Sequence, residues 1–172
     1  VGVQALRNIT TGAQSVAIGC QALDAVTTGS FNTAVGHNAM TACTESYQSA
    51  FGHTALAALT TGTRNNAFGA FSLDANTTGS FNTALGQASL GANTTASNNT
   101  AVGYAALLLN TTGASNTAVG KSALSLNATG QRNTALGFEA AELSTASDNV
   151  AIGYKALDTT TSGSNNTAVG TE

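Results

Sequence analysis

The chain has 172 residues, of which 42% are hydrophobic and only 8% are charged, and its formal net charge is −3. A nearly neutral chain with this apolar content can bury a core, which argues against a disordered protein. The five Lys and Arg residues are scattered, which argues against a nucleic-acid partner because phosphate neutralisation needs clustered cations.

Two further classes are disfavoured by what the sequence lacks. No apolar run approaches the roughly 20 residues of a transmembrane helix, so we expect no membrane span in this segment. Two cysteines, Cys20 and Cys43, do not make a disulfide framework.

A five-residue motif recurs along the whole chain. Its commonest form is Asn-Thr-Ala-Val-Gly, as at residues 32–36 and 116–120. Ten complete copies close at Gly19, Gly36, Gly52, Gly69, Gly86, Gly103, Gly120, Gly137, Gly153 and Gly170, with spacings of 17 or 16 residues. A fixed period of this length predicts stacked structural repeats. We therefore expect residues 1–172 to form one repeat domain, and because the pattern starts and stops mid-motif, we expect a segment of a longer fibre.

Each motif predicts a short strand. Thr and Val alternate with Ala and Gly, so they lie on opposite faces of a strand. We expect two columns to form the core: the large apolar residue before each glycine, such as Val35, and the Leu four residues after it, such as Leu56. We also expect the Asn that starts most motifs to form a hydrogen-bonded ladder along the stack, or to adopt left-handed turn geometry.

The rest of each coil is predicted to hold a second short strand and turns. Recurrent glycines argue against a helix in the Ala-Leu segments. Thr-Thr-Gly clusters, as at residues 27–29 and 77–79, indicate turns in which Gly supplies a positive φ. The fold predicted is all-β, a parallel β-solenoid or β-roll of about ten 17-residue coils, with a length on the order of 50 Å.

The sequence offers little for catalysis. It has no Gly-x-Ser-x-Gly elbow, phosphate-binding loop or paired-Cys zinc motif, so we assign no catalytic residue, no enzyme activity and no cofactor. The position after the closing glycine holds Cys20, His37 and His53 in three consecutive coils, and these are candidate metal ligands. The same column continues with Ala70 and Tyr104, which is typical of an exposed variable position, so we assign no metal site.

The repeat resembles two families of extracellular proteins. Ser-Val-Ala-Ile-Gly at 15–19 and Asn-Val-Ala-Ile-Gly at 149–153 resemble the head repeat of trimeric autotransporter adhesins. The denser Asn-Thr-Ala-Val-Gly pattern with its Thr-Thr-Gly turns resembles bacteriophage tail-fibre repeats. The resemblance implies a left-handed β-roll packed as a homotrimer, located on a virion fibre or a bacterial cell surface. The 17-residue period is longer than that of the adhesin head, which implies a different cross-section.

These observations predict a mechanical function, as a stiff spacer or head of an attachment fibre. Its partner would be itself, as a homotrimer, together with a host-surface glycan or protein. One alternative is a subunit of a self-assembling extracellular filament. A second is an ice-binding solenoid, because regular Thr columns on a flat face can order water; the interruption of the strand-start Thr column by Val16 and Asn66 argues against it.

Overall fold

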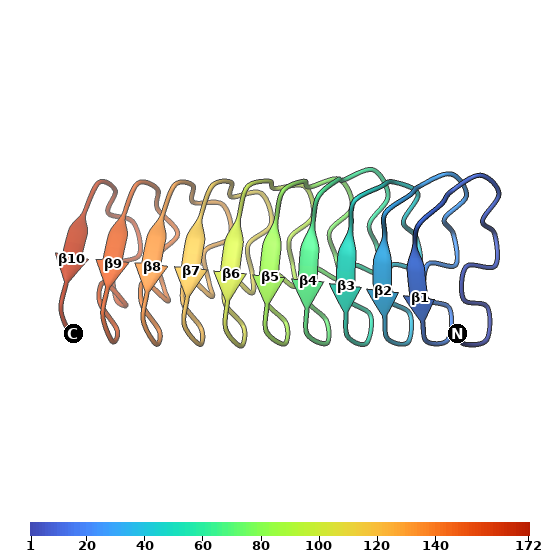
Figure 1. The fold of residues 1–172 in the computed structure, drawn as a ribbon. Coiled ribbons are helices and arrows are strands. Elements are labelled where there is room, and N and C mark those ends of the chain that lie inside the picture. The colour runs from blue at the N-terminus through green and yellow to red at the C-terminus, as the bar shows by residue number, and fades with distance from the viewer.

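The computed structural model describes all of residues 1–172 as a rod of stacked coils with the two termini at opposite ends (Figure 1). One three-residue strand per coil contributes to a single ten-stranded parallel sheet in chain order. The strands are β1 (Val16–Ile18), β2 (Thr33–Val35), β3 (Ser49–Phe51), β4 (Asn66–Phe68), β5 (Thr83–Leu85), β6 (Thr100–Val102), β7 (Thr117–Val119), β8 (Thr134–Leu136), β9 (Val150–Ile152) and β10 (Thr167–Val169). The predicted parallel β-solenoid is therefore confirmed.

Equivalent residues of successive coils are paired in register. Thr117 faces Thr134, Ala118 faces Ala135 and Val119 faces Leu136. The 16-residue coils keep the same register, since Val35 still faces Phe51. The missing residue is therefore absorbed outside the strands.

The core is built from small residues and one leucine column. The Ala at the centre of each strand points inward, and from Ala34 to Ala151 it is fully buried. The predicted Leu column, four residues after the closing glycine, is also buried, as at Leu56 and Leu90. The prediction that the residue before the glycine belongs to the core was wrong. The strand alternates with a period of two, so burying Ala turns Thr and Val outward.

The predicted second strand is absent, and turns replace it. After each closing glycine the chain runs through turns in which two non-glycine residues have left-handed backbone angles, for example Gln21 (φ 57°) and Leu23 (φ 53°). This conformation costs an L-residue roughly 1–2 kcal/mol. Coil-to-coil hydrogen bonds offset the cost: the Leu23 N–H donates to the Ala39 carbonyl at 3.1 Å.

The prediction that the glycine of each Thr-Thr-Gly turn supplies a positive φ was wrong. The closing glycines have φ between 129° and 146°, whereas the turn glycines, such as Gly79, do not have a positive φ. A Cβ on Gly79 would instead collide with the Ala96 carbonyl oxygen of the next coil. The turn glycine is therefore required by close stacking, not by its backbone angle.

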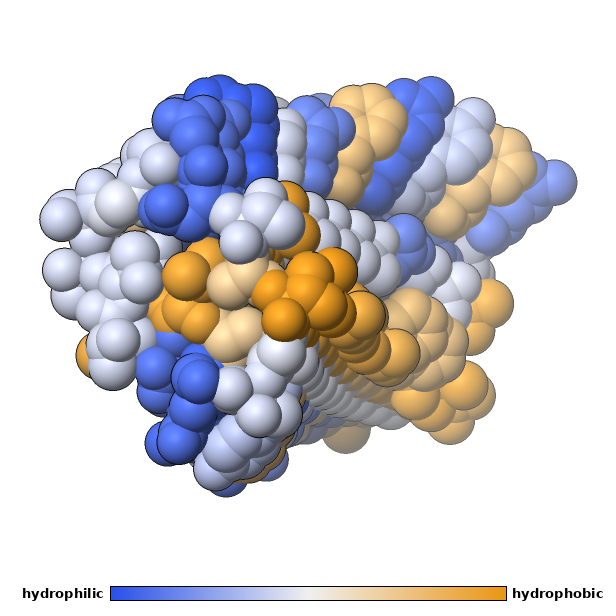
Figure 2. Space-filling view, turned by 90° about the vertical axis from the view of Figure 1, so that its left-hand side faces the viewer, coloured by the Kyte–Doolittle hydropathy of each residue, from blue (hydrophilic) through white to orange (hydrophobic).

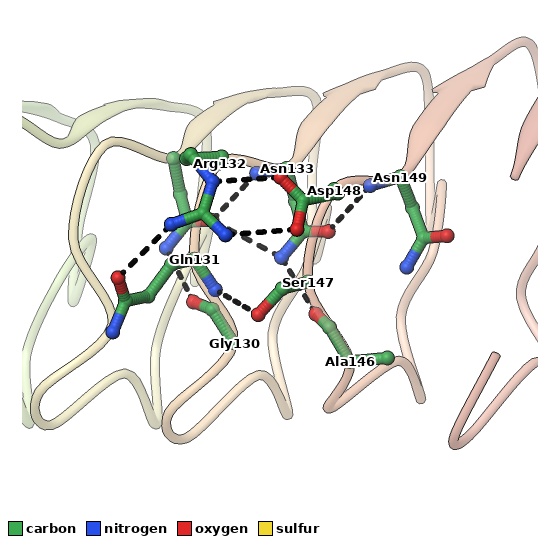
Figure 3. A network of polar contacts seen from close by, with 9 residues as sticks. Gly130, Gln131, Arg132, Asn133, Ala146, Ser147, Asp148 and Asn149 are labelled. Atoms are coloured by element: carbon green, nitrogen blue, oxygen red, sulfur yellow. Dashed lines mark hydrogen bonds and ion pairs between the residues drawn. The ribbon is translucent and has the colours of Figure 1, made fainter. Parts of the chain in front are cut away.

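A ladder of buried amides runs along the rod, as predicted from the Asn column. Figure 3 shows two of its steps: the Asn133 amide donates to the Ala146 carbonyl at 2.8 Å, and the Asn149 N–H donates to Asn133 Oδ1 at 3.0 Å. Each amide thus joins its own coil to the next one. The left-handed geometry expected of this Asn belongs to the residue before it, for example Arg132 (φ 56°).

A second amide ladder was not predicted. Asn76, Asn93, Asn110 and Asn127 are fully buried at the position that Val26, Cys43 and Leu59 occupy in earlier coils. The Asn93 amide donates to Asn76 Oδ1 at 2.9 Å, and the Asn110 amide donates to Asn93 Oδ1 at 3.0 Å. This column of the interior is therefore apolar in the coils of Val26, Cys43 and Leu59, and it becomes hydrogen-bonded from Asn76 onward.

Candidate functional site

The outer face of the sheet carries a continuous row of exposed or half-buried apolar side chains. We call this row the apolar stripe; it consists of Ile18, Val35, Phe51, Phe68, Leu85, Val102, Val119, Leu136, Ile152 and Val169. Figure 2, which looks onto the C-terminal end of the rod, shows it as an orange row along one side. The rings of Phe51 and Phe68 stack within it at a centroid distance of 4.7 Å.

An uncovered stripe of this kind is unusual for a parallel sheet. Parallel sheets normally have both faces covered, and large contiguous apolar patches on soluble proteins mark interaction sites. Here the inner face packs on the core while the outer face leaves Leu85 48% exposed. The stripe is the main surface feature that sequence reasoning misassigned, because it placed these side chains in the core.

A second row of side chains projects from the turn before each strand. Phe31, Tyr47, Arg64 and Phe81 occupy equivalent positions in four consecutive coils, and all four are exposed. The Phe31 and Tyr47 rings stack at 5.1 Å, and the Arg64 guanidinium carbon lies 5.8 Å from the Tyr47 centroid and 5.4 Å from the Phe81 centroid. We call these four residues the aromatic ridge. Their spacing of 16 or 17 residues is visible in the sequence, whereas the contacts between the four side chains are not.

The candidate metal column is partly assembled. The His37 and His53 rings stack at a centroid distance of 5.3 Å, and both side chains are exposed. The Phe71 ring lies at 69° to the His53 ring, with a centroid distance of 5.1 Å. No group of three or more His, Cys, Asp or Glu side chains is arranged to hold a metal ion. Cys20 therefore does not complete a ligand set with the two histidines in this structure.

The second cysteine is enclosed by the core. Cys43 is fully buried, and burial raises the pKa of its thiol to about 11. At neutral pH the thiol is therefore protonated, and the nucleophilic thiolate form is scarce. Cys43 therefore contributes to the packing of the core.

Charged side chains pair mostly between neighbouring coils. Arg132 contacts both carboxylate oxygens of Asp148, at 2.7 and 2.8 Å (Figure 3), and this hydrogen bonding lowers the pKa of Asp148. Arg7 pairs with Asp24 at 3.0 Å, and Lys155 with Glu139 at 3.6 Å. The acidic residues of these pairs serve as partners for cations of the adjacent coils.

The first Thr of several turn pairs bonds to the next coil through its hydroxyl group. The hydroxyl of Thr60 donates to the Thr77 carbonyl at 2.9 Å, and that of Thr77 donates to the Thr94 carbonyl at 3.0 Å. Hydroxyls that bond to the next coil do not offer their protons to surface water. The second Thr of each pair, such as Thr78, is exposed.

The one hollow on the surface lies at the C-terminal end of the stack. It is lined by residues of the last coil, 155–160 and 168–172, and includes Lys155, Asp158 and Glu172.

Comparison with known proteins does not extend this description. Nothing matches the chain among protein-family models, curated proteins or solved structures. The structure also has no helix of the length and hydrophobicity needed to span a membrane.

Proposed function

We propose that the chain is a rigid structural segment of an extracellular attachment fibre and that it assembles as a parallel homotrimer through the apolar stripe. The fibre would belong to a phage tail or a bacterial surface, as the repeat resemblance implies. The observation that carries the proposal is the uncovered apolar stripe, which runs along the whole sheet face.

A second copy of the same chain fits the stripe better than an unrelated partner. The stripe repeats once per coil, at the ~4.8 Å spacing of paired strands, over ten coils. A partner must present apolar groups at the same spacing over the same length to fill it. Another copy aligned in parallel presents the same apolar groups at the same spacing and over the same length. Burying these side chains in the contact supplies the driving force for assembly.

Rigidity follows from how the coils are joined. Every pair of neighbouring coils shares strand hydrogen bonds, and buried amides such as Asn133 add side-chain hydrogen bonds. The buried polar side chains are Asn, Gln and Ser, without a charged residue among them. A rod of this kind suits a spacer that holds a binding tip away from a surface.

The test is the oligomeric state of matched leucine variants. Leu85 and Leu109 are exposed to similar extents, 48% and 45%, but only Leu85 lies in the stripe. We expect light scattering coupled to size exclusion to give a trimer for the wild type and for Leu109→Lys. Leu85→Lys combined with Leu136→Lys should give monomers, because lysines would face one another in the contact.

The measured oligomeric state distinguishes the trimeric fibre segment from the filament. A monomeric wild type, or a Leu85→Lys/Leu136→Lys variant that stays trimeric, would contradict assembly through the stripe. Long unbranched polymers under the electron microscope would instead favour the filament.

A further inference from the structure

Arg64 is held between two aromatic rings and lacks an acidic partner. Its guanidinium lies between Tyr47 and Phe81 and makes no ion pair or side-chain hydrogen bond within the chain. A ring on either side restricts where the guanidinium can move, and cation–π contact of this kind is favourable. The N–H groups of Arg64 therefore remain available to a ligand from outside the chain.

The same column shows what a guanidinium at this position can bind. Arg132 occupies the equivalent position four coils later and holds Asp148 of the next coil through two hydrogen bonds, at 2.7 and 2.8 Å (Figure 3). One coil on from Arg64, the corresponding residue is Phe81. Phe81 therefore stands beside Arg64 at the position where Asp148 stands beside Arg132, so Arg64 has no carboxylate of its own chain to bind. A planar two-oxygen acceptor from outside the chain can take its place.

The surroundings of Arg64 define the remainder of the ligand. Asn66, two residues further on, is exposed and its side chain makes no hydrogen bond within the chain. Thr63, beside Arg64, is half-buried and has a hydroxyl group. Neutral amide and hydroxyl groups suit sugar hydroxyls, and the exposed Tyr47 and Phe81 rings offer apolar surface for contact with the sugar ring. The ridge contains a single cation, which suits one carboxylate better than a polyanion.

We propose that Arg64, together with Tyr47, Phe81 and Asn66, binds a sugar that carries a carboxylate group, of the sialic-acid or uronic-acid class. This proposal rests on the proposed function, in that the rod must be displayed outside the cell to meet such a glycan. The aromatic ridge lies along a different edge of the rod from the apolar stripe, on the upper side of Figure 2. Arg64, Tyr47 and Phe81 therefore stay accessible when the stripe is covered, whereas Asn66 shares the outer face of β4 with the stripe residue Phe68.

The probes are sialyllactose, a glucuronic-acid disaccharide and neutral lactose, with binding measured by calorimetry or by ligand-observed NMR. We expect at least one acidic sugar to bind with a dissociation constant on the order of 1 mM and lactose not to bind. Whichever acid binds identifies the source of the carboxylate. Affinity should fall as salt is raised, because a charge pair at the surface is screened.

Variants at the two arginines of the column provide the control. Arg64→Gln should weaken binding by at least about tenfold. Arg64→Lys should also weaken it, because an ammonium cannot form the planar pair. Arg132→Gln should bind like the wild type, since Arg132 is already occupied by Asp148. Unchanged binding by Arg64→Gln, equal binding of lactose, or no binding of either acid at about ten times the expected dissociation constant would overturn the site.

The oligomeric state is measured on the same samples. A trimer that binds neither acidic sugar would reject the site and leave the fibre proposal standing. A monomer that binds one would reject assembly through the stripe and leave the site standing.

Discussion

The centre of each strand holds an alanine that the structure encloses completely. Ala34, Ala84 and Ala118 are fully buried, while the residues on either side of each point outward. A coil of about 17 residues is narrow, so a methyl group facing the Leu column fills the space between its walls. The size of this one side chain therefore sets which face of the strand becomes the surface of the rod.

The closing glycines provide a prediction at this scale. Gly86 has a φ of 138°, and a Cβ there would collide with the carbonyl oxygen of Gly103 in the next coil. Gly86→Ala should lower the free energy of unfolding by roughly 3 kcal/mol or more, because strain and a backbone collision add. Urea denaturation followed by circular dichroism measures the change.

Gly91 supplies the matched control. Its φ is not positive, and the nearest atom to an added Cβ is the Ala88 carbonyl oxygen at 3.3 Å. Gly91→Ala should change stability by less than about 1 kcal/mol. Equal losses in the two variants would contradict this account of the closing glycine.

Residue types alone predicted that the strand alternates, but they did not predict which of its two faces is buried. The pattern of Thr and Val against Ala and Gly was correct, and so was the buried Leu column. Hydrophobicity favoured Val35 and its equivalents as core residues. The narrow interior favours Ala instead, and this depends on the coil radius, which a single repeat does not reveal. The aromatic ridge was missed for a related reason: its contacts are made between coils.

At the scale of the element, each coil is a strand joined to turns that are held by amides. The buried Asn at the start of the motif takes the place of a second strand, because both of its side-chain groups bond to the backbone of the next coil. The repetition of this Asn made the ladder predictable. The second ladder, beginning at Asn76, occupies only part of the rod, and so it lacks the full periodicity that revealed the first.

Asn133 tests the ladder directly. Asn133→Ala would leave the Asn149 N–H and the Ala146 carbonyl without the partners they have now. An unsatisfied buried group costs about 1–3 kcal/mol, so we expect a loss of roughly 2–4 kcal/mol in unfolding free energy. The neighbouring Thr134→Ala, at an exposed position, should cost less than about 1 kcal/mol. If chemical denaturation gives the two variants the same midpoint, the ladder contributes nothing specific.

On the scale of the whole molecule, the rod is held by burial and hydrogen bonds. Only 8% of residues are charged, and the ion pairs between coils lie at or near the surface. Surface pairs contribute roughly 0–1 kcal/mol each and are weakened by salt. The ion pairs therefore contribute little to the stability of the stack.

Salt dependence checks this view of the molecule. Raising NaCl from about 0.05 to about 1 M should change the free energy of unfolding by less than about 1 kcal/mol. Thermal melts at the two concentrations provide the measurement. A large loss of stability in high salt would mean that the ion pairs hold the coils together.

The placement of the termini at opposite ends determines how each chain responds to tension (Figure 1). A pull on both ends acts along the direction in which neighbouring coils are bonded, so every coil carries the same load. Each coil that detaches releases about 55–60 Å of extended chain. The rod would then lengthen in equal steps under force, giving way one coil at a time while the remainder stays folded.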